Sequence, residues 1–111
     1  MKNIKIKNKY IGSKYPPFII AEISANHKKS LNRIYKIINA ASKAGFDAIK
    51  VQTYKPETIT MKLNSDDFKI IDKKSLWNNK TLYEIYKKGS LPWEWHDKIS
   101  KFCTKKKNYF F

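Results

Sequence analysis

Cysteine is nearly absent from this sequence, because Cys103 is the only one among 111 residues. A single cysteine excludes the internal disulfide framework that stabilises many small secreted domains. We therefore expect a reducing, cytoplasmic location and a fold that depends on its hydrophobic core. Cys103 itself falls among apolar positions with helical spacing, so we expect a buried core side chain rather than a reactive thiol.

Long hydrophobic runs are also missing, and no segment approaches the roughly 18 apolar residues of a membrane span. The first residues, MKNIKIKNK, alternate lysine with isoleucine and show no signal peptide. A membrane partner is therefore not expected. The length suits one small domain or part of a larger protein, and a hydrophobic content of 41% is enough for a modest core.

Acidic residues and arginine are scarce. There are 24 basic and 9 acidic residues, which give a net charge of +15, yet Arg33 is the only arginine. Nucleic-acid surfaces usually use arginine for bidentate contacts to phosphate and guanine, and here the lysines are spread over every segment. We expect a solvated basic surface and no nucleic-acid partner. A small basic module that binds a polyanion is the alternative from a different class.

The first half of the chain has the pattern of a strand, a helix and a second strand. Residues 18–24 form an almost wholly apolar run, which is typical of a strand covered on both faces. Ser30 can cap a helix that begins at Leu31, and Gly45 can end it. Residues 47–53, DAIKVQT, read as the second strand. Because the connections are short, the two strands must be parallel in a βαβ unit.

The flanking segments are less regular. Residues 1–17 predict a short hairpin or edge strand, which we treat as separate from a domain over 18–111. Residues 54–79 lack a pattern, and Leu76 and Trp77 within them suggest an excursion that packs on something. Thr81 opens a capping-box helix that stops at Gly89.

The end of the sequence predicts a further helix and a third strand. Pro92 suits the first turn of that helix. Its expected apolar face consists of Trp95, Ile99, Phe102 and Cys103. Residues 108–111, NYFF, read as the third strand. Such a series leaves sheet edges exposed, so we expect the N-terminal part of a larger α/β protein.

Polar side chains interrupt both inner strands. Glu22 lies on one face of the first strand, and Lys50 and Gln52 share one face of the second. If this face is the interior of a barrel, the three groups lie at the carboxyl ends of the strands, where active sites of parallel α/β barrels occur. The alternative is a buried Glu22–Lys50 ion pair without chemistry.

Other conspicuous residues have ordinary structural interpretations. His27 follows a strand and is expected to be a hydrogen-bonding linchpin rather than a ligand, and His96 stands alone on a helix. No second histidine or cysteine lies at a spacing typical of metal sites. Trp93 and Trp95 are expected to be packing residues.

Four ordered blocks carry a family resemblance that runs from about Phe18 to the end. The blocks are FIIAEISANHKKSL, AGFDAIKVQTY, LWNNKTLYEIY and LPWEWH. Together they resemble the sialic acid synthase (NeuB-type) family, and within it the pseudaminic acid synthases more than the N-acetylneuraminate or legionaminate synthases, which remain alternatives. The resemblance implies a (β/α)8 TIM barrel, of which this chain supplies about the first two to three βα units.

The resemblance also implies a reaction. Such enzymes condense phosphoenolpyruvate with an open-chain amino sugar, here 2,4-diacetamido-2,4,6-trideoxy-altropyranose, and release phosphate. They use a divalent metal of the Mn or Mg type, and the full-length proteins are expected to be homodimers.

By resemblance, Glu22 and Lys50 are catalytic. Lys50 binds phosphoenolpyruvate, Gln52 and Glu22 bind the sugar, and Asn26 and His27 support the motif loop. The metal ligands are expected beyond residue 111, so we expect the isolated chain to be inactive.

Overall fold

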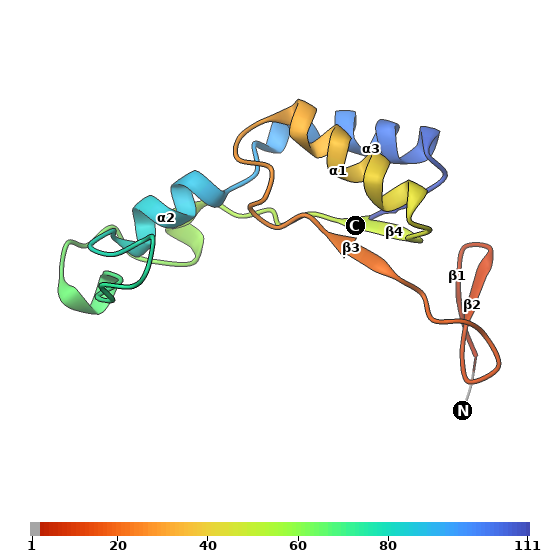
Figure 1. The fold of residues 1–111 in the computed structure, drawn as a ribbon, viewed down its shortest axis with the longest axis horizontal. Helices are drawn as coiled ribbons and strands as arrows, with labels where there is room; N and C mark the ends of the chain where they lie inside the picture. The colour runs from red at the N-terminus through yellow and green to blue at the C-terminus, as the bar shows by residue number, and fades with distance from the viewer. Residues whose placement is uncertain (1–2) are drawn as a thin grey trace.

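A computed structural model describes residues 3–111, and its centre is a three-stranded parallel sheet. The strands are β3 (Ile20–Glu22), β4 (Ala48–Lys50) and β5 (Tyr109–Phe110), in that spatial order. Helices α1 (Leu31–Lys43) and α3 (His96–Lys105) lie together over one face of the sheet (Figure 1). The parallel βαβ unit is therefore confirmed, and so is the third strand.

Local signals set the ends of α1 as predicted. The Ser30 hydroxyl accepts a hydrogen bond from the Arg33 backbone N–H at 3.2 Å and so satisfies one free donor of the first turn. The helix stops at Lys43, and Gly45 follows with a φ of 86°, a left-handed conformation that glycine adopts without steric cost.

The hydrophobic core lies between the helices and the sheet. Its fully buried side chains include Ile34 and Ile38 from α1, Ile99 and Cys103 from α3, and Ile49 from β4. Burial raises the pKa of the Cys103 thiol to about 11, so the thiol stays protonated and unreactive at neutral pH. The interpretation of Cys103 as a core residue is confirmed.

The opposite face of the sheet is open, contrary to the expectation for residues 18–24. Ile20, which shares a face of β3 with Glu22, is 46% exposed. The apolar run suggested a strand covered on both faces, but the helices cover only one. The exposed face of β3 also carries Glu22, so this carboxylate is accessible to solvent.

An antiparallel hairpin packs against the amino ends of the strands. It consists of β1 (Ile4–Ile6) and β2 (Lys9–Ile11). Lys9 forms an ion pair with Asp47 just before β4, and the Tyr109 hydroxyl donates to the Asn8 side chain. The hairpin and α2 (Leu82–Gly89) lie at opposite ends of the molecule (Figure 1). The domain boundary after residue 17 remains a prediction.

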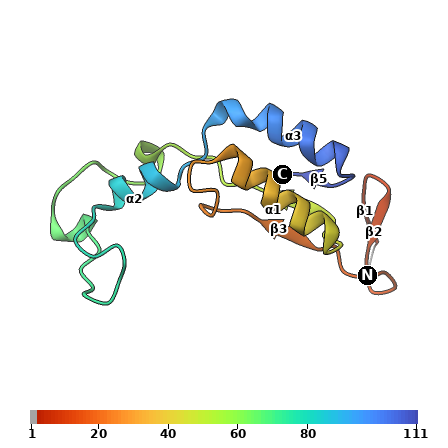
Figure 2. The same ribbon diagram turned by 45° about the horizontal axis from the view of Figure 1, so that its top comes forward.

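Residues 54–90 form a lobe that extends away from the sheet (Figure 2). It holds α2 and two short 3-10 turns, Pro56–Thr58 and Asp66–Phe68. The predicted capping box of α2 is present, with Thr81 and Glu84 each satisfying the backbone N–H of the other. The Ile70 backbone bonds to the chain before α2 at both Asn79 and Lys80, and these bonds close the loop.

Three expectations about apolar residues need correction. Leu76 is 97% exposed, so it does not anchor the excursion by packing. Pro92 precedes a 3-10 turn, Trp93–Trp95, and α3 begins only at His96. Trp93 is 55% exposed and is not an ordinary packing residue, whereas Trp95 does pack against the core.

Among residues 3–111, no helix is long and apolar enough to cross a membrane.

Ile49 provides a test of this core. Truncation of this fully buried strand residue in Ile49→Ala should lower the free energy of unfolding by about 2 to 5 kcal/mol, because it leaves a cavity under both helices. The matched control is Ile71→Ala, which removes the same atoms from a side chain that is 64% exposed and should cost within about 0.5 kcal/mol. Urea unfolding followed by circular dichroism measures both; equal losses would contradict this description of the core.

Candidate active site at the carboxyl ends of the strands

Three polar side chains converge where β3 and β4 end. Lys50 Nζ lies 2.8 Å from Glu22 Oε2, and Gln52 Nε2 donates to Glu22 Oε1 at 2.9 Å. The sheet register places Glu22 directly beside Lys50. Gln52 comes two residues later and therefore faces the same side. The sequence prediction that these three residues meet agrees with the structure, while their chemical roles remain predictions.

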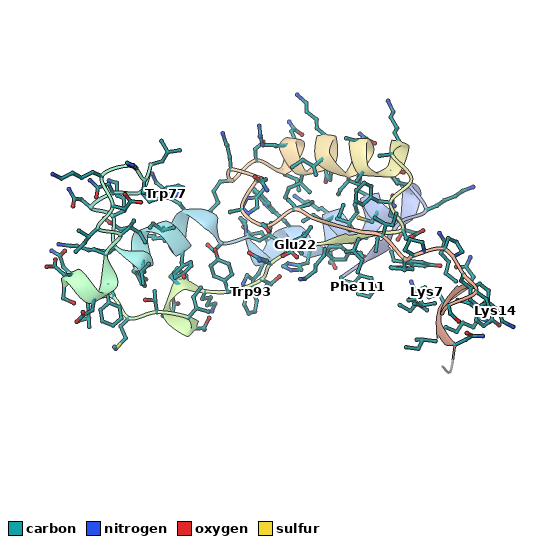
Figure 3. The ribbon with its side chains drawn as sticks, turned by 60° about the horizontal axis from the view of Figure 1, so that its bottom comes forward. Lys7, Lys14, Glu22, Trp77, Trp93 and Phe111 are labelled. Carbon is teal, nitrogen blue, oxygen red and sulfur yellow. The ribbon has the colours of Figure 1, made fainter. Side chains whose placement is uncertain are left out.

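The alternation of side chains separates this polar cluster from the core. Ile23, Ile49 and Val51 occupy the intervening positions and are buried beneath the helices. The polar set therefore faces the open side of the sheet. Figure 3 shows Glu22 on the sheet, at a distance from the lobe that carries Trp77.

The Glu22 carboxylate is held in its ionised form. The hydrogen bond from Lys50 lowers the pKa of Glu22 most; partial burial opposes this effect, and Gln52 and Ser24 add to the lowering. The Glu22 and Lys50 side chains remain 33% and 49% exposed. The pair is therefore part-exposed rather than buried, and pairs of this kind contribute only about 0 to 1 kcal/mol to stability. Whether the pair has a chemical role stays a prediction.

The loop after β3 adopts an unusual backbone. Ser24, Lys28 and Lys29 have φ values of 49°, 47° and 55°. Such left-handed conformations are uncommon for residues other than glycine and cluster at functional sites. Three of them within six residues indicate that the surrounding contacts, rather than local preference, determine the path of this loop.

His27 provides one of those contacts. Its ring is fully buried, Nδ1 accepts from the Lys29 backbone N–H at 3.1 Å, and Nε2 lies 3.1 Å from the Gly89 carbonyl oxygen. This arrangement requires the neutral tautomer, with Nε2–H as the donor to Gly89. Because both ring nitrogens are engaged, His27 is a hydrogen-bonding linchpin between the loop and the end of α2, as the sequence indicates.

Asn26 holds the same loop from within. Its side-chain amide donates to the Ile23 backbone carbonyl at 3.1 Å, and the backbone carbonyl of Asn26 accepts from Arg33 Nε at 2.6 Å. These bonds tie the loop to the end of β3 and to the first turn of α1. They support the expected role of Asn26 in supporting the motif loop.

The sequence interpretation missed a contact at the end of β4. Thr53 Oγ1 lies 2.6 Å from His96 Nε2, and His96 Nδ1 lies 2.8 Å from the Trp93 carbonyl oxygen. His96 is therefore not isolated: it joins the start of α3 to the residue after Gln52. The only signal in the sequence is the alternation that turns Thr53 toward the helices.

A comparison with known proteins assigns the family. The sequence profile of the NeuB family matches residues 37–111, which is more than half of the chain. The chain belongs to the NeuB family. This assignment agrees with the family resemblance carried by the four sequence blocks.

The matches to named relatives cover most of this chain but only about a quarter of each relative. The pseudaminic acid synthase of Campylobacter jejuni is 51% identical over 82 residues, which are 74% of this chain and 23% of that enzyme. The pseudaminic acid synthase of Helicobacter pylori is 40% identical over 90 residues, or 81% of this chain and 26% of that enzyme. The chain thus spans about a quarter of the length of these curated relatives.

A solved structure supports the fold. The N-acetylneuraminic acid (sialic acid) synthetase of Leptospira borgpetersenii superposes with a TM-score of 0.74 at 25% identity. The match covers 99% of this chain and 33% of that structure. The α/β arrangement with a parallel sheet is therefore that of a NeuB-family protein.

The family resemblance implies a metal ion, but the described residues of this NeuB-family chain provide no binding site for one. Residues 3–111 contain no group of three histidine, cysteine or acidic side chains that could hold a metal ion. We therefore assign no metal chemistry to these residues. The expectation that the ligands lie beyond residue 111 stays a prediction.

The Glu22–Lys50 contact can be tested by titration. In Lys50→Met the pKa of Glu22 should rise toward or above its ordinary value of 4.5, because the largest stabilising contact of the carboxylate is lost. NMR detection of the Glu22 carboxyl carbon across an acid titration measures this pKa. Lys36→Met removes the same charge from an exposed position of α1 and should leave the titration unchanged; an equal rise in both variants would contradict a direct contact.

His27 makes stability depend on pH. Burial lowers the pKa of His27 below its ordinary value of 6.5, and the bond to Gly89 only partly opposes this effect. Below its ordinary value of 6.5 the unfolded chain binds a proton that the folded chain excludes, so folding stability should fall as the pH drops from above 6.5 to below it. His27→Gln should be less stable at neutral pH and lose this part of the pH dependence. Urea midpoints across this range measure the effect, and an unchanged slope in the variant would exclude His27 as the source.

Proposed function

We propose that this chain is the first part of a pseudaminic acid synthase, which condenses phosphoenolpyruvate with the diacetamido sugar to give pseudaminic acid and phosphate. The observation that carries the proposal is the convergence of Glu22, Lys50 and Gln52 on the open face of the sheet in a NeuB-family chain. The names of the Campylobacter and Helicobacter relatives support the choice of sugar.

The fold that we propose for the complete protein is a (β/α)8 barrel. Three adjacent parallel strands with helices on one face are consistent with one segment of its wall. The exposed face with Ile20 and Glu22 would then be the interior. A typical barrel takes roughly 250 residues, so this chain cannot close one alone, and we propose that the isolated chain is inactive.

The proposed chemistry begins with charge. Phosphoenolpyruvate carries a carboxylate and a phosphate, and the Lys50 ammonium can bind either group on the open face of the sheet. Glu22 stays ionised beside it, so a cation that develops on the substrate would lie near a fixed negative charge. The Gln52 amide can hold the sugar, because it is oriented by its bond to Glu22.

These groups fit one reaction sequence. Carbon 3 of phosphoenolpyruvate attacks the sugar aldehyde, and a carbon–carbon bond forms while positive charge develops at carbon 2. Glu22 stabilises that charge and can take a proton from the water that adds there, and one proton goes to the former aldehyde oxygen, which becomes a hydroxyl. The resulting tetrahedral centre expels phosphate by cleavage of the carbon–oxygen bond, and the new hydroxyl gives its proton to the departing phosphate as the ketone forms. The atoms balance with one water consumed and one phosphate released.

Further partners are also proposals. A divalent metal of the Mn or Mg type and a homodimer are proposed for the full-length protein on the family resemblance alone. We propose neither a nucleic-acid nor a membrane partner, and we propose a cytoplasmic location. An N-acetylneuraminate or legionaminate synthase would contain the same three residues; the likeness to the Leptospira synthetase favours this second candidate, and only the sugar would differ.

A hybrid enzyme tests the proposal. We would replace the matching first quarter of the Campylobacter relative with this chain and measure phosphate release from phosphoenolpyruvate with the diacetamido sugar. The hybrid should be active, and Glu22→Gln should lower kcat by about 10²- to 10³-fold, because the charge at the reacting centre is lost. Glu57→Gln, which makes the same change at an exposed position of the lobe, is the matched control.

Two results would contradict the proposal. Turnover by the isolated 111-residue chain would show that it needs no further segment. A Glu22→Gln hybrid as active as its parent would remove the proposed role of Glu22. Activity with N-acetylmannosamine instead of the diacetamido sugar would favour the neuraminate alternative.

A further inference from the structure

The Gln52 amide lies at an open part of the candidate site. Gln52 is exposed and lines a cavity of about 380 Å³ whose aromatic wall consists of Tyr54, Trp77 and Tyr86. Within residues 3–111 its side chain forms one hydrogen bond, from Nε2 to Glu22 Oε1 at 2.9 Å. Packing therefore does little to orient this amide, and its direction depends on the path of the backbone that carries it.

The backbone that carries Gln52 has just left the sheet. The Val51 N–H donates to the Phe111 carbonyl at 3.0 Å and continues the ladder one residue past β4. Within residues 3–111, neither Gln52 nor Thr53 forms a backbone hydrogen bond. In this part of the chain a side-chain contact takes over from the ladder.

Thr53 and His96 provide that contact. His96 Nδ1 lies 2.8 Å from the Trp93 carbonyl oxygen, which can only accept, so Nδ1 carries the proton. In the neutral ring Nε2 is then an acceptor, and the Thr53 hydroxyl donates to it at 2.6 Å. The Phe110 ring of β5 lies beside the imidazole, with centroids 6.2 Å apart. His96 is thus oriented by its neighbours and offers one directed acceptor to Thr53.

We propose that Thr53 and His96 are positioning residues for sugar binding, because they hold the end of β4 so that the Gln52 amide faces Glu22. Successive side chains of an extended segment point to opposite sides. A Thr53 side chain that is bonded to the start of α3 therefore keeps Gln52 on the open face of the sheet. This inference rests on the proposed function, in which Gln52 holds the sugar.

The first test uses NMR on the ¹⁵N,¹³C-labelled 111-residue chain. Thr53→Val removes the hydroxyl at nearly constant volume. It should shift the signals of the Gln52 side-chain amide and raise the pKa of Glu22, because the bond from Gln52 helps to keep that carboxylate ionised. Thr53→Ser keeps the hydroxyl and should preserve the parent pKa. The matched control is Thr104→Val, which breaks an exposed bond to the Ser100 carbonyl in α3 and should change neither signal.

Variants of His96 test the same contact from a distant position in the sequence. His96→Phe keeps a ring beside Phe110 but loses the acceptor, so it should reproduce both changes seen in Thr53→Val. His96→Gln can accept from Thr53 through its amide oxygen and should behave like the parent chain. The double variant Thr53→Val/His96→Phe should change Glu22 no more than either single variant, because both remove one contact.

A contact that only stabilises the fold predicts a different result. In that case Thr53→Val and His96→Phe would lower the urea midpoint but leave the Gln52 amide and the Glu22 titration as in the parent chain. That outcome would overturn the positioning role. So would a rise in the pKa of Glu22 in His96→Gln as large as in His96→Phe.

Kinetics of the hybrid enzyme give a second readout. Thr53→Val and His96→Phe should each raise KM for the diacetamido sugar about five- to tenfold, the usual effect of one lost hydrogen bond. KM for phosphoenolpyruvate should stay unchanged, because Lys50 remains in the sheet ladder. Thr53→Ser and His96→Gln should keep the parent values. An equal rise in KM for both substrates would contradict a role that acts through Gln52.

The two readouts separate this inference from the proposed function. An inactive parent hybrid would contradict the proposed function, while titration of the 111-residue chain would still decide whether Thr53 and His96 orient Gln52. An active parent hybrid whose Thr53→Val and His96→Phe variants keep both KM values would overturn the inference and leave the proposed function standing.

Discussion

The parallel pairing of β3 with β4 is the constraint on which the rest of this structure depends. It places Glu22 beside Lys50. A slip of one residue in β3 would turn Glu22 toward the helices, and a slip in β4 would do the same to Lys50. The register is held from both ends. The Asp47 carboxylate accepts from the Ile19 backbone N–H at 2.8 Å, and the Ile23 backbone N–H donates to the Lys50 carbonyl at 2.9 Å. The geometry of the candidate site is thus a property of the backbone ladder.

The two faces of the sheet have different roles because of that strand pairing. The face with Ile49 is buried by α1 and α3 and supplies stability, while the open face exposes its polar groups to solvent. The loop after β3 then connects the two functions. His27 is buried among the core elements, yet it bonds to the Gly89 carbonyl at the end of α2. The position of the lobe beside Gln52 therefore depends on a contact that begins in the core.

Much of the fold could be predicted because its signals are local. The cap at Ser30 and the capping box at Thr81 act within a single turn, and alternation along the strands predicted the meeting of Glu22 with Lys50. The failures involve tertiary surroundings. The exposure of Ile20 depends on which face the helices cover, and no periodicity reports that.

The unpredicted parts of the site have the same origin. The contact between Thr53 and His96 joins residues 43 positions apart. The cavity beside Gln52 draws its aromatic wall from the loop after β4, from the lobe and from α2, and these segments share no pattern in the sequence. The block LWNNKTLYEIY contains both Trp77 and Tyr86, but the family resemblance assigned no role to either residue.

The hairpin at the amino ends of the strands has a consequence for the order of folding. The Tyr109 hydroxyl donates a hydrogen bond to Asn8, which lies 101 positions earlier in the sequence, so segments near the two ends of the described chain are in contact. Contacts of such high sequence separation carry a large loop-closure entropy and form late. The Lys9–Asp47 ion pair can hold the hairpin against β4 as soon as residue 47 has been synthesised, whereas the contact with β5 can form only after Tyr109 has been added.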